Sequence, residues 1–200
     1  MNESSISNEQ ARSDQSMIEQ GVIKQTRCWV KTVIVGNNFC PFARRELERG
    51  SIRYSVKTGR DMESALQAVV DECIQLDNND AIETMLLIFP EGFQDFEDYL
   101  QLVELAEGLL ADQGYESVYQ VASFHPDYCF AGAEQNDAAN YTNRSPYPML
   151  HLIREASLEQ ALINYPEPEK IPEQNVERAR ELGLEEMQRR LKACCSIDKQ

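Results

Sequence analysis

The sequence predicts an α/β fold in which helices flank a small, mainly parallel sheet of three to four strands. Two segments with strand patterns, residues 52–56 and 85–89, are separated by an amphipathic helical pattern, and a second helical pattern leads to a strand pattern at 118–125. Strands that alternate with helices in this way pair in parallel through right-handed crossovers. A ferredoxin-like α+β arrangement is the alternative, because it also combines a short sheet with two crossing helices.

The length of 200 residues, with 42% hydrophobic and 26% charged residues, indicates one domain with a substantial core. We assign this α/β domain to residues 17–165. Residues 1–16 are almost entirely polar and are expected to form a disordered tail, because so few apolar groups cannot offset the entropy of ordering. Residues 166–200 are expected to form a linker and a C-terminal helical extension.

The domain is expected to begin with two helices. Apolar residues recur at helical spacing from Met17 onward, and Gly36 ends the pattern. Pro41 suits the first turn of a second, short helix, with Cys40 as its cap and Gly50 as its end. This assignment places the Cys40 thiol at a helix N-terminus.

The next elements are predicted by hydrophobic periodicity. Apolar and polar residues alternate over 52–56, as in a strand buried on one face. An amphipathic helix follows Asp61, which is its expected cap. The uninterrupted apolar run 85–89 indicates a central strand that is covered on both faces. A helix is predicted over 93–112 and a third strand over 118–125.

A loop of about twenty residues, 127–148, follows the third strand and has no usable periodicity. Because it contains aromatic, amide and arginine side chains, we expect it to be ordered and functional. Residues 149–154 fit a fourth strand at the edge of the sheet, although a helical turn is the open alternative. A helix capped by Ser157 and ending at Asn164 should follow. Beyond the Pro-rich linker, one or two helices change phase at Gly183.

The charge distribution is strongly acidic and uneven. The formal net charge is -15, and residues 61–143 contain eighteen Asp and Glu residues without one Lys or Arg. Such a surface repels nucleic acid and anionic lipid, so we expect neither as a partner. It serves solubility or attracts a basic protein partner. The sequence contains neither a run of about 20 apolar residues nor the apolar core of a signal peptide, which favours a cytoplasmic protein without a membrane span.

Six cysteines are present, and none has the Cys-x-x-Cys spacing of a zinc knuckle or a thioredoxin motif. We therefore expect reduced thiols rather than a disulfide framework. Cys28 and Cys73 are interpreted as small buried hydrophobic residues. Cys194 and Cys195 are interpreted as reduced thiols of the C-terminal tail, from which a bridge to the core is hard to build.

Cys40 is the first candidate for chemistry. Unpaired N–H groups and the helix dipole stabilise a thiolate at a helix N-terminus, and Arg44 or Arg45 would lower the thiol pKa further if it pointed at the sulfur. His125 and His151, the only histidines, would then supply the base. The alternative is a cap buried among aromatic residues, whose thiol is inert.

The same residues also allow a metal site as an alternative function. Cys40, His125 and His151, together with Cys129, offer the nitrogen and sulfur ligands of a zinc-type centre. Their spacing matches no known metal signature. We therefore assign no metal ligands.

The loop contains a candidate anion clamp. Asn143, Arg144 and Ser145 combine a guanidinium with amide and hydroxyl donors in a turn stiffened by proline, which suits a carboxylate or phosphate. Arg154 is a potential partner, although His151 and Arg154 point to opposite faces if the segment is a strand. The alternative is that Arg144 pairs with one of the eighteen acids of residues 61–143 and only holds the loop in place.

The motifs Asn38-Phe39-Cys40-Pro41-Phe42-Ala43, Phe124-His125-Pro126 and Thr142-Asn143-Arg144-Ser145-Pro146, followed by His151 and Arg154, resemble domain-of-unknown-function family 1415. The resemblance extends from about Met17 to Ala193. It implies a small bacterial cytoplasmic protein and brings no reaction, cofactor or partner with it.

The sequence thus predicts an enzyme of unknown reaction or a binding protein. Its pocket would gather Cys40, His125, His151 and the Arg144 turn around a small anionic molecule, with Cys40 as nucleophile or redox thiol. The alternatives are the metal site and a non-catalytic adaptor, which uses the acidic face and the C-terminal helices to bind a basic partner.

Overall fold

The computed structural model describes residues 3–163 and 165–197, and their strands form one four-stranded sheet. The strands are β1 (Ile52–Val56), β2 (Thr84–Ile88), β3 (Tyr119–Phe124) and β4 (Met149–Arg154). The α-helices are α1 (Glu3–Trp29), α2 (Ala43–Arg49), α3 (Met62–Asp77), α4 (Phe96–Asp112), α5 (Glu155–Leu162), α6 (Ile171–Leu182) and α7 (Leu184–Cys195). A π-helix, η1 (Val30–Val35), and two 3-10 helices, η2 (Ala138–Thr142) and η3 (Pro168–Lys170), complete the elements.

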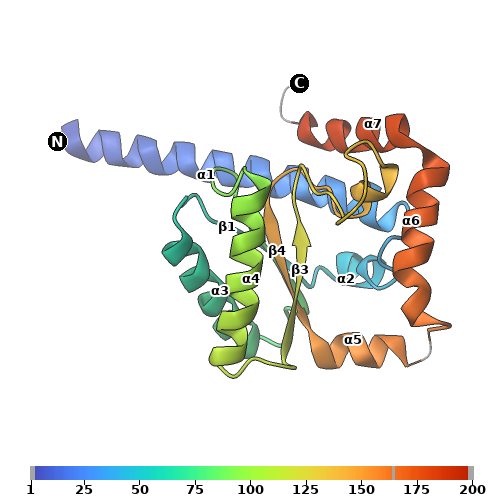
Figure 1. Cartoon of the computed structure of the whole chain (residues 1–200). Helices are drawn as coiled ribbons and strands as arrows, with labels where there is room; N and C mark the ends of the chain where they lie inside the picture. Colours follow the sequence, from blue (N-terminus) through green and yellow to red (C-terminus); the bar gives the residue numbers. More distant parts are fainter. Residues whose placement is uncertain (1–2, 164, 198–200) are drawn as a thin grey trace.

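The sheet lies between two helical layers. Helices α3 and α4 run side by side over one face, and α1, η1 and the C-terminal helices cover the other (Figure 1). Successive side chains of β2 alternate between these layers, with Met85 and Leu87 in the core under α3 and α4, and Leu86 and Ile88 in the core under α1. Burial on both faces is the reason that residues 85–88 of this strand are all apolar.

The α/β class is confirmed, but the sheet is mixed rather than mainly parallel. The strand order is β1-β2-β4-β3, and only β1 and β2 pair in parallel, whereas β4 is antiparallel to both of its neighbours. The loop 127–148 returns the chain to the end of the sheet where β3 finishes, so β4 must run backward. The element order also differs from that of the ferredoxin-like alternative.

Strand β4 also lies in the centre of the sheet, whereas the sequence predicted an edge strand. Its side chains explain the position. Leu150 and Leu152 are buried under α3 and α4, and Met149 is buried on the opposite face. A strand with apolar groups on both faces exposes the least apolar surface to water when both faces are covered. The alternation also places His151 and Arg154 on opposite faces, as expected for a strand.

Helix α1 begins much earlier than predicted. The chain is helical from Glu3, whereas residues 1–16 were expected to be a disordered tail; Met1 and Asn2 lie outside the described residues. The N-terminal part of α1 extends past the sheet (Figure 1), and Met17 and Ile18 are exposed there. Once the buried end of a helix is formed, each added residue costs little, and no Pro or Gly interrupts residues 3–20.

The first helix ends in the π-helix η1, which periodicity did not predict. Gly36 closes it, and a Cβ atom at this position would lie 2.3 Å from the Thr32 carbonyl oxygen. Only glycine allows this approach. The following residue, Asn37, is buried and donates from its side chain to the Val33 carbonyl.

Several predicted helix ends are confirmed. The Asp61 side chain accepts from the Ser64 N–H at the start of α3, and Gly50 ends α2 in the left-handed conformation. The second helix, however, begins at Ala43 with Phe42 as its N-cap, so Cys40 is not the cap residue. Gly183 separates α6 from α7 as predicted. Helix α5 ends at Leu162, and its predicted end at Asn164 lies outside the described residues.

In the part of the chain that the structure describes, no helix combines the length and apolar character needed to cross a membrane.

Candidate functional site

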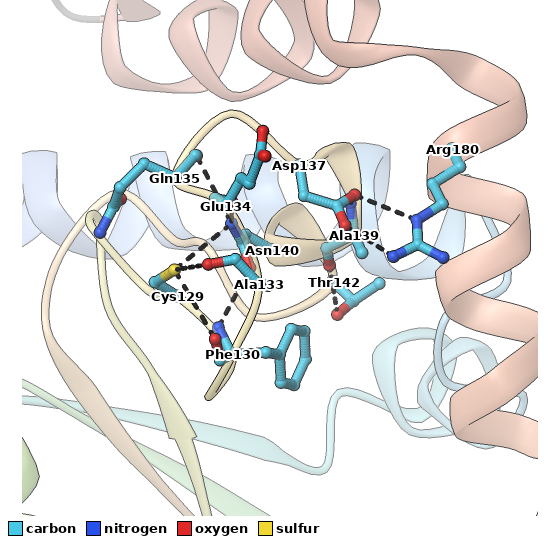
Figure 2. A network of polar contacts seen from close by, with 10 residues as sticks. All are labelled: Cys129, Phe130, Ala133, Glu134, Gln135, Asp137, Ala139, Asn140, Thr142 and Arg180. Atoms are coloured by element: carbon cyan, nitrogen blue, oxygen red, sulfur yellow. Dashed lines mark hydrogen bonds and ion pairs between the residues drawn. The ribbon is translucent and has the colours of Figure 1, made fainter.

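The long loop after β3 is an ordered structure built around one buried amide, that of Asn140 (Figure 2). The Asn140 Oδ1 atom accepts from the Phe130 N–H at 3.1 Å, and its Nδ2 group donates to the Glu134 carbonyl at 2.9 Å. The Cys129 sulfur lies 3.8 Å from the same nitrogen. Asn140 therefore ties the two halves of the loop together, as its complete burial requires.

The loop is attached to α6 by an ion pair. Asp137, the N-cap of η2, accepts two hydrogen bonds from the Arg180 guanidinium, and its Oδ1 atom also accepts from the Ala139 N–H (Figure 2). These donors lower the pKa of the Asp137 carboxyl. The pair fixes the loop against the C-terminal helices.

The predicted anion clamp is occupied by the protein itself. The Arg144 guanidinium donates to the Tyr128 carbonyl at 3.0 Å and to the Gln135 carbonyl at 3.0 Å, and it lies over the Tyr141 ring. Asn143 donates to the Ser123 carbonyl. Arg144 thus holds the loop in place, through carbonyl oxygens rather than through an acid.

Ser145, the third residue of the predicted clamp, is also engaged within the loop. It is buried, and its hydroxyl donates to the Tyr147 carbonyl. The neighbouring Arg144 carbonyl accepts from Trp29 Nε1 at 2.9 Å, which joins the loop to α1. All three residues of the clamp therefore serve the loop's own structure.

His125 is completely buried, and both of its ring nitrogens have backbone partners. Nδ1 accepts from the Asp127 N–H at 3.0 Å, and Nε2 lies 3.0 Å from the Phe93 carbonyl oxygen, to which it donates. The ring packs against Phe96 and Tyr99 of α4. Burial lowers the pKa of His125, so the neutral ring is favoured. This geometry is that of a structural histidine.

His151 lies on the other side of the sheet, in β4 beside Phe124. The Thr84 hydroxyl donates to the Leu152 carbonyl at 2.7 Å, so its oxygen accepts from His151 Nε2–H at 2.6 Å. Burial lowers the pKa of His151 to about 4. The imidazole is therefore neutral at pH 7.

The His151 pKa predicts a loss of stability in mild acid. The unfolded chain has a histidine pKa of about 6.5, so between that pH and about 4 it binds more protons than the folded chain. The free energy of unfolding should fall as the pH decreases through this window, by about 2 kcal/mol at pH 5. Urea unfolding at pH 7 and at pH 5 measures this decrease in the free energy of unfolding. In the His151→Gln variant, which keeps a donor for Thr84, most of this loss should vanish; an unchanged loss would contradict the assignment.

Cys40 is half-buried and packs against the core under α1, on the opposite side of the sheet from His125. Burial raises the pKa of the Cys40 thiol, and the N–H groups of Phe42 and Ala43, which donate to the sulfur, offset this only in part. Arg44 is exposed on α2 and is not among the groups that act on the thiol. These surroundings favour the inert alternative.

Arg154 caps the C-terminal end of α3. Its guanidinium donates to the Leu76 carbonyl at 2.6 Å and to the Ile82 carbonyl at 3.2 Å. A cation suits this end of the helix dipole. The length of β4, about 17 Å, separates Arg154 from the Arg144 turn, so the two arginines do not form one clamp.

The predicted site residues therefore do not form one pocket. The Arg144 turn and His125 lie together at one end of the sheet, where His125 and Asn143 share a backbone hydrogen bond. Within the described residues, no hydrogen bond joins Cys40 to either histidine, and no three His, Cys, Asp or Glu side chains gather as metal ligands would.

Sequence reasoning missed Asn140 and Asp137, the two residues that organise the loop. Each is an ordinary polar residue in a segment without periodicity, so nothing distinguished Asn140 from the loop's other asparagines. The Asp137-Ala138-Ala139 pattern was the one available signal, because Asp is a favoured helix cap.

A small hollow of about 180 Å³ lies where β1 ends and α3 begins. Its lining includes Lys57, Thr58, Gly59 and Ser64. The ends of parallel strands are common ligand sites in α/β proteins. Here, however, the Asp61 carboxylate already accepts from the first turn of α3. An anionic ligand would therefore meet a fixed negative charge.

The outer surface of α3 and α4 is the most distinctive feature of the exterior. It lies within the segment that contains no Lys or Arg, and its exposed carboxylates have no ion-pair partner within the described residues. Three large apolar side chains are exposed among them, at 39% to 44% of their surface. We call this surface the acidic face, and it comprises Glu63, Asp71, Glu97, Asp98, Glu104, Glu107 and Asp112 with Ile74, Leu100 and Leu105.

Comparison with protein families identifies the group to which the sequence is related. The family model described as "Protein of unknown function (DUF1415)" matches residues 21–189. The chain belongs to the DUF1415 family. Searches of curated proteins and of solved structures found no match. The DUF1415 match includes every predicted site residue and the acidic face, whereas residues 3–20 of α1 and the end of α7 lie outside it.

Proposed function

We propose that this protein is a non-catalytic binding protein whose acidic face docks a basic, amphipathic segment of a partner protein. The observation that carries the proposal is the segregation of charge. Residues 61–143, which include all of α3 and α4, contain no cation, while the layer on the other side of the sheet contains exposed arginines and lysines. A field of one sign over one face steers a partner of opposite charge.

Exposed apolar side chains also give this surface the means to make apolar contacts with a partner. Ile74 on α3 and Leu100 and Leu105 on α4 are 44%, 39% and 42% exposed. Apolar groups surrounded by carboxylates match a helix that has leucines on one side and lysines or arginines around them. Charge attracts such a segment from a distance, and the apolar contacts select it over an unpatterned basic chain.

The state of the predicted pocket also supports a binding function over catalysis. The nitrogens of His125 and the guanidiniums of Arg144 and Arg154 already have backbone partners. Burial raises the pKa of Cys40, which leaves its thiol protonated at neutral pH. Each of these groups would have to give up existing contacts before it could act on a substrate.

The test uses two synthetic peptides of identical composition. One arranges leucine and lysine as an amphipathic helix, and the other has the same residues in scrambled order. Binding to the full chain is measured by fluorescence anisotropy at low and at physiological salt. We expect the amphipathic peptide to bind more tightly, and both affinities to fall as salt rises.

Matched charge reversals locate the surface. The double variant Glu104→Lys/Glu107→Lys on α4 should lose about tenfold in affinity for the amphipathic peptide. The double variant Glu173→Lys/Glu177→Lys, which makes the same charge change on exposed positions of α6, should lose much less. Equal binding of the two peptides, or equal losses in the two variants, would reject the proposed surface.

A further inference from the structure

Two cysteines from opposite ends of the chain lie together between α1 and α7. Cys28 is in α1 and Cys194 is in the last turn of α7, and both sulfurs lie near the hydroxyl group of Thr32. The Thr32 hydroxyl oxygen lies 3.9 Å from the Cys28 sulfur and 3.2 Å from the Cys194 sulfur. Both cysteines are free thiols, as the sequence predicts, but Cys194 does not belong to an exposed tail, because α7 returns onto α1 and buries it.

We propose that Cys28 and Cys194 form a reversible disulfide that locks α7 onto α1 when the protein meets a peroxide. Cys28 is the half-buried member of the pair, whereas Cys194 is only 1% exposed. An oxidant therefore reaches the Cys28 sulfur first. Cys194 lies in the last turn of α7, and the end of a helix moves more readily than its interior to bring two sulfurs to bonding distance.

The reaction balances with a peroxide as the oxidant. The Cys28 thiol attacks the peroxide ROOH, which becomes the alcohol ROH and leaves a sulfenic acid on Cys28. The Cys194 sulfur then bonds to the Cys28 sulfur, and the hydroxyl group leaves with the Cys194 proton as water. A dithiol reductant restores both thiols. Burial raises the pKa of Cys194 to about 12, so Cys194 is protonated at neutral pH and carries the proton that leaves with the hydroxyl group.

The lock has a structural consequence, because α7 and α6 cover the segment before Cys40. Arg190 of α7 donates to the Asn37 side chain, and Asn175 of α6 donates to the Phe39 carbonyl at 2.6 Å. Met187 of α7 is fully buried in the same core. Fixing the end of α7 therefore suppresses the openings that expose this segment. Cys194 lies beyond the residues matched by the family, so we infer the lock for this chain alone.

The experiment treats the full reduced chain with hydrogen peroxide and maps its disulfides by mass spectrometry under non-reducing conditions. We expect one Cys28–Cys194 link within the monomer and a rise in Tm of about 5–10 °C, both reversed by dithiothreitol. Alkylation of Cys40 by iodoacetamide should also become slower in the oxidised protein. A link that forms with no change in Tm or Cys40 alkylation would overturn the locking role.

Single substitutions provide the controls. Cys28→Ser and Cys194→Ser should each abolish the link and the Tm rise, whereas Cys195→Ser, a neighbouring change on α7, should leave both intact. A near-native Tm of the reduced variants establishes that they fold. Formation of a Cys28–Cys195 link, of intermolecular links only, or of no link in folded protein would refute the proposal.

Discussion

Replacing Asn140 with alanine should lower the free energy of unfolding by about 2–4 kcal/mol, because the substitution removes a completely buried amide that holds two backbone groups of the loop. The Asn140 side chain is completely buried and bonds to the Phe130 N–H and the Glu134 carbonyl. Phe130 is half-buried and Glu134 is exposed, so the cost comes from the loss of two hydrogen bonds made by a completely buried amide and from the space that the amide leaves.

Urea unfolding measures this effect, and Asn143→Ala is the matched control. Asn143 is an asparagine of the same loop, but it is only half-buried; its amide donates to the Ser123 carbonyl and accepts from the Thr142 hydroxyl, which also donates to the Ala139 carbonyl. The Asn143→Ala substitution should lower the free energy of unfolding by about 1 kcal/mol. Equal losses at the two positions would show that Asn140 is not the centre of the loop. Trp29, the sole tryptophan, reports on the loop by fluorescence because its Nε1 donates to Arg144.

Replacing Trp29 with alanine should lower the free energy of unfolding by about 3–5 kcal/mol. The ring is 1% exposed and packs edge-to-face on Phe124 at a centroid distance of 5.0 Å. The change creates a cavity between α1 and the sheet and also removes the only Nε1–H that reaches the Arg144 carbonyl. Trp29→Phe should cost about 1–2 kcal/mol, because most of the apolar contact remains.

The control for this position lies on the same helix. Met17 is 63% exposed, so Met17→Ala should change the free energy of unfolding by less than about 0.5 kcal/mol. The Trp29→Phe and Asn140→Ala changes should also be less than additive when combined, because both weaken the same loop. Strict additivity would mean that α1 and the loop are independent.

Most helices and strands were predictable because their signals are local. Asp61 caps α3 through its own side chain, and Gly50 ends α2 because glycine accepts a positive φ. The alternation in β1 and the apolar run in β2 report directly on which faces are buried. The π-helix η1 was not predictable in this way, because its wider turn depends on the close contact at Gly36.

The candidate site was predictable only in part. The sequence correctly indicated an ordered loop after β3, and its alternative interpretation of Arg144 as a residue that holds the loop agrees with the hydrogen bonds. It could not indicate that His125 and His151 lie on opposite sides of the sheet. His125 follows its strand and packs on α4, and no periodic signal describes that position.

By itself, the sequence determined the features that depend on neighbours within a few residues: caps, turns, strand alternation and the cation-free segment 61–143 that becomes the acidic face. The tertiary structure alone decided the central position of β4, the partners of the polar loop residues, and the placement of Cys28 and Cys194 around the Thr32 hydroxyl. The physical reason is that local signals depend on backbone conformation and side-chain period. Contacts between distant segments depend on which apolar faces are buried against one another, and many arrangements satisfy the same period.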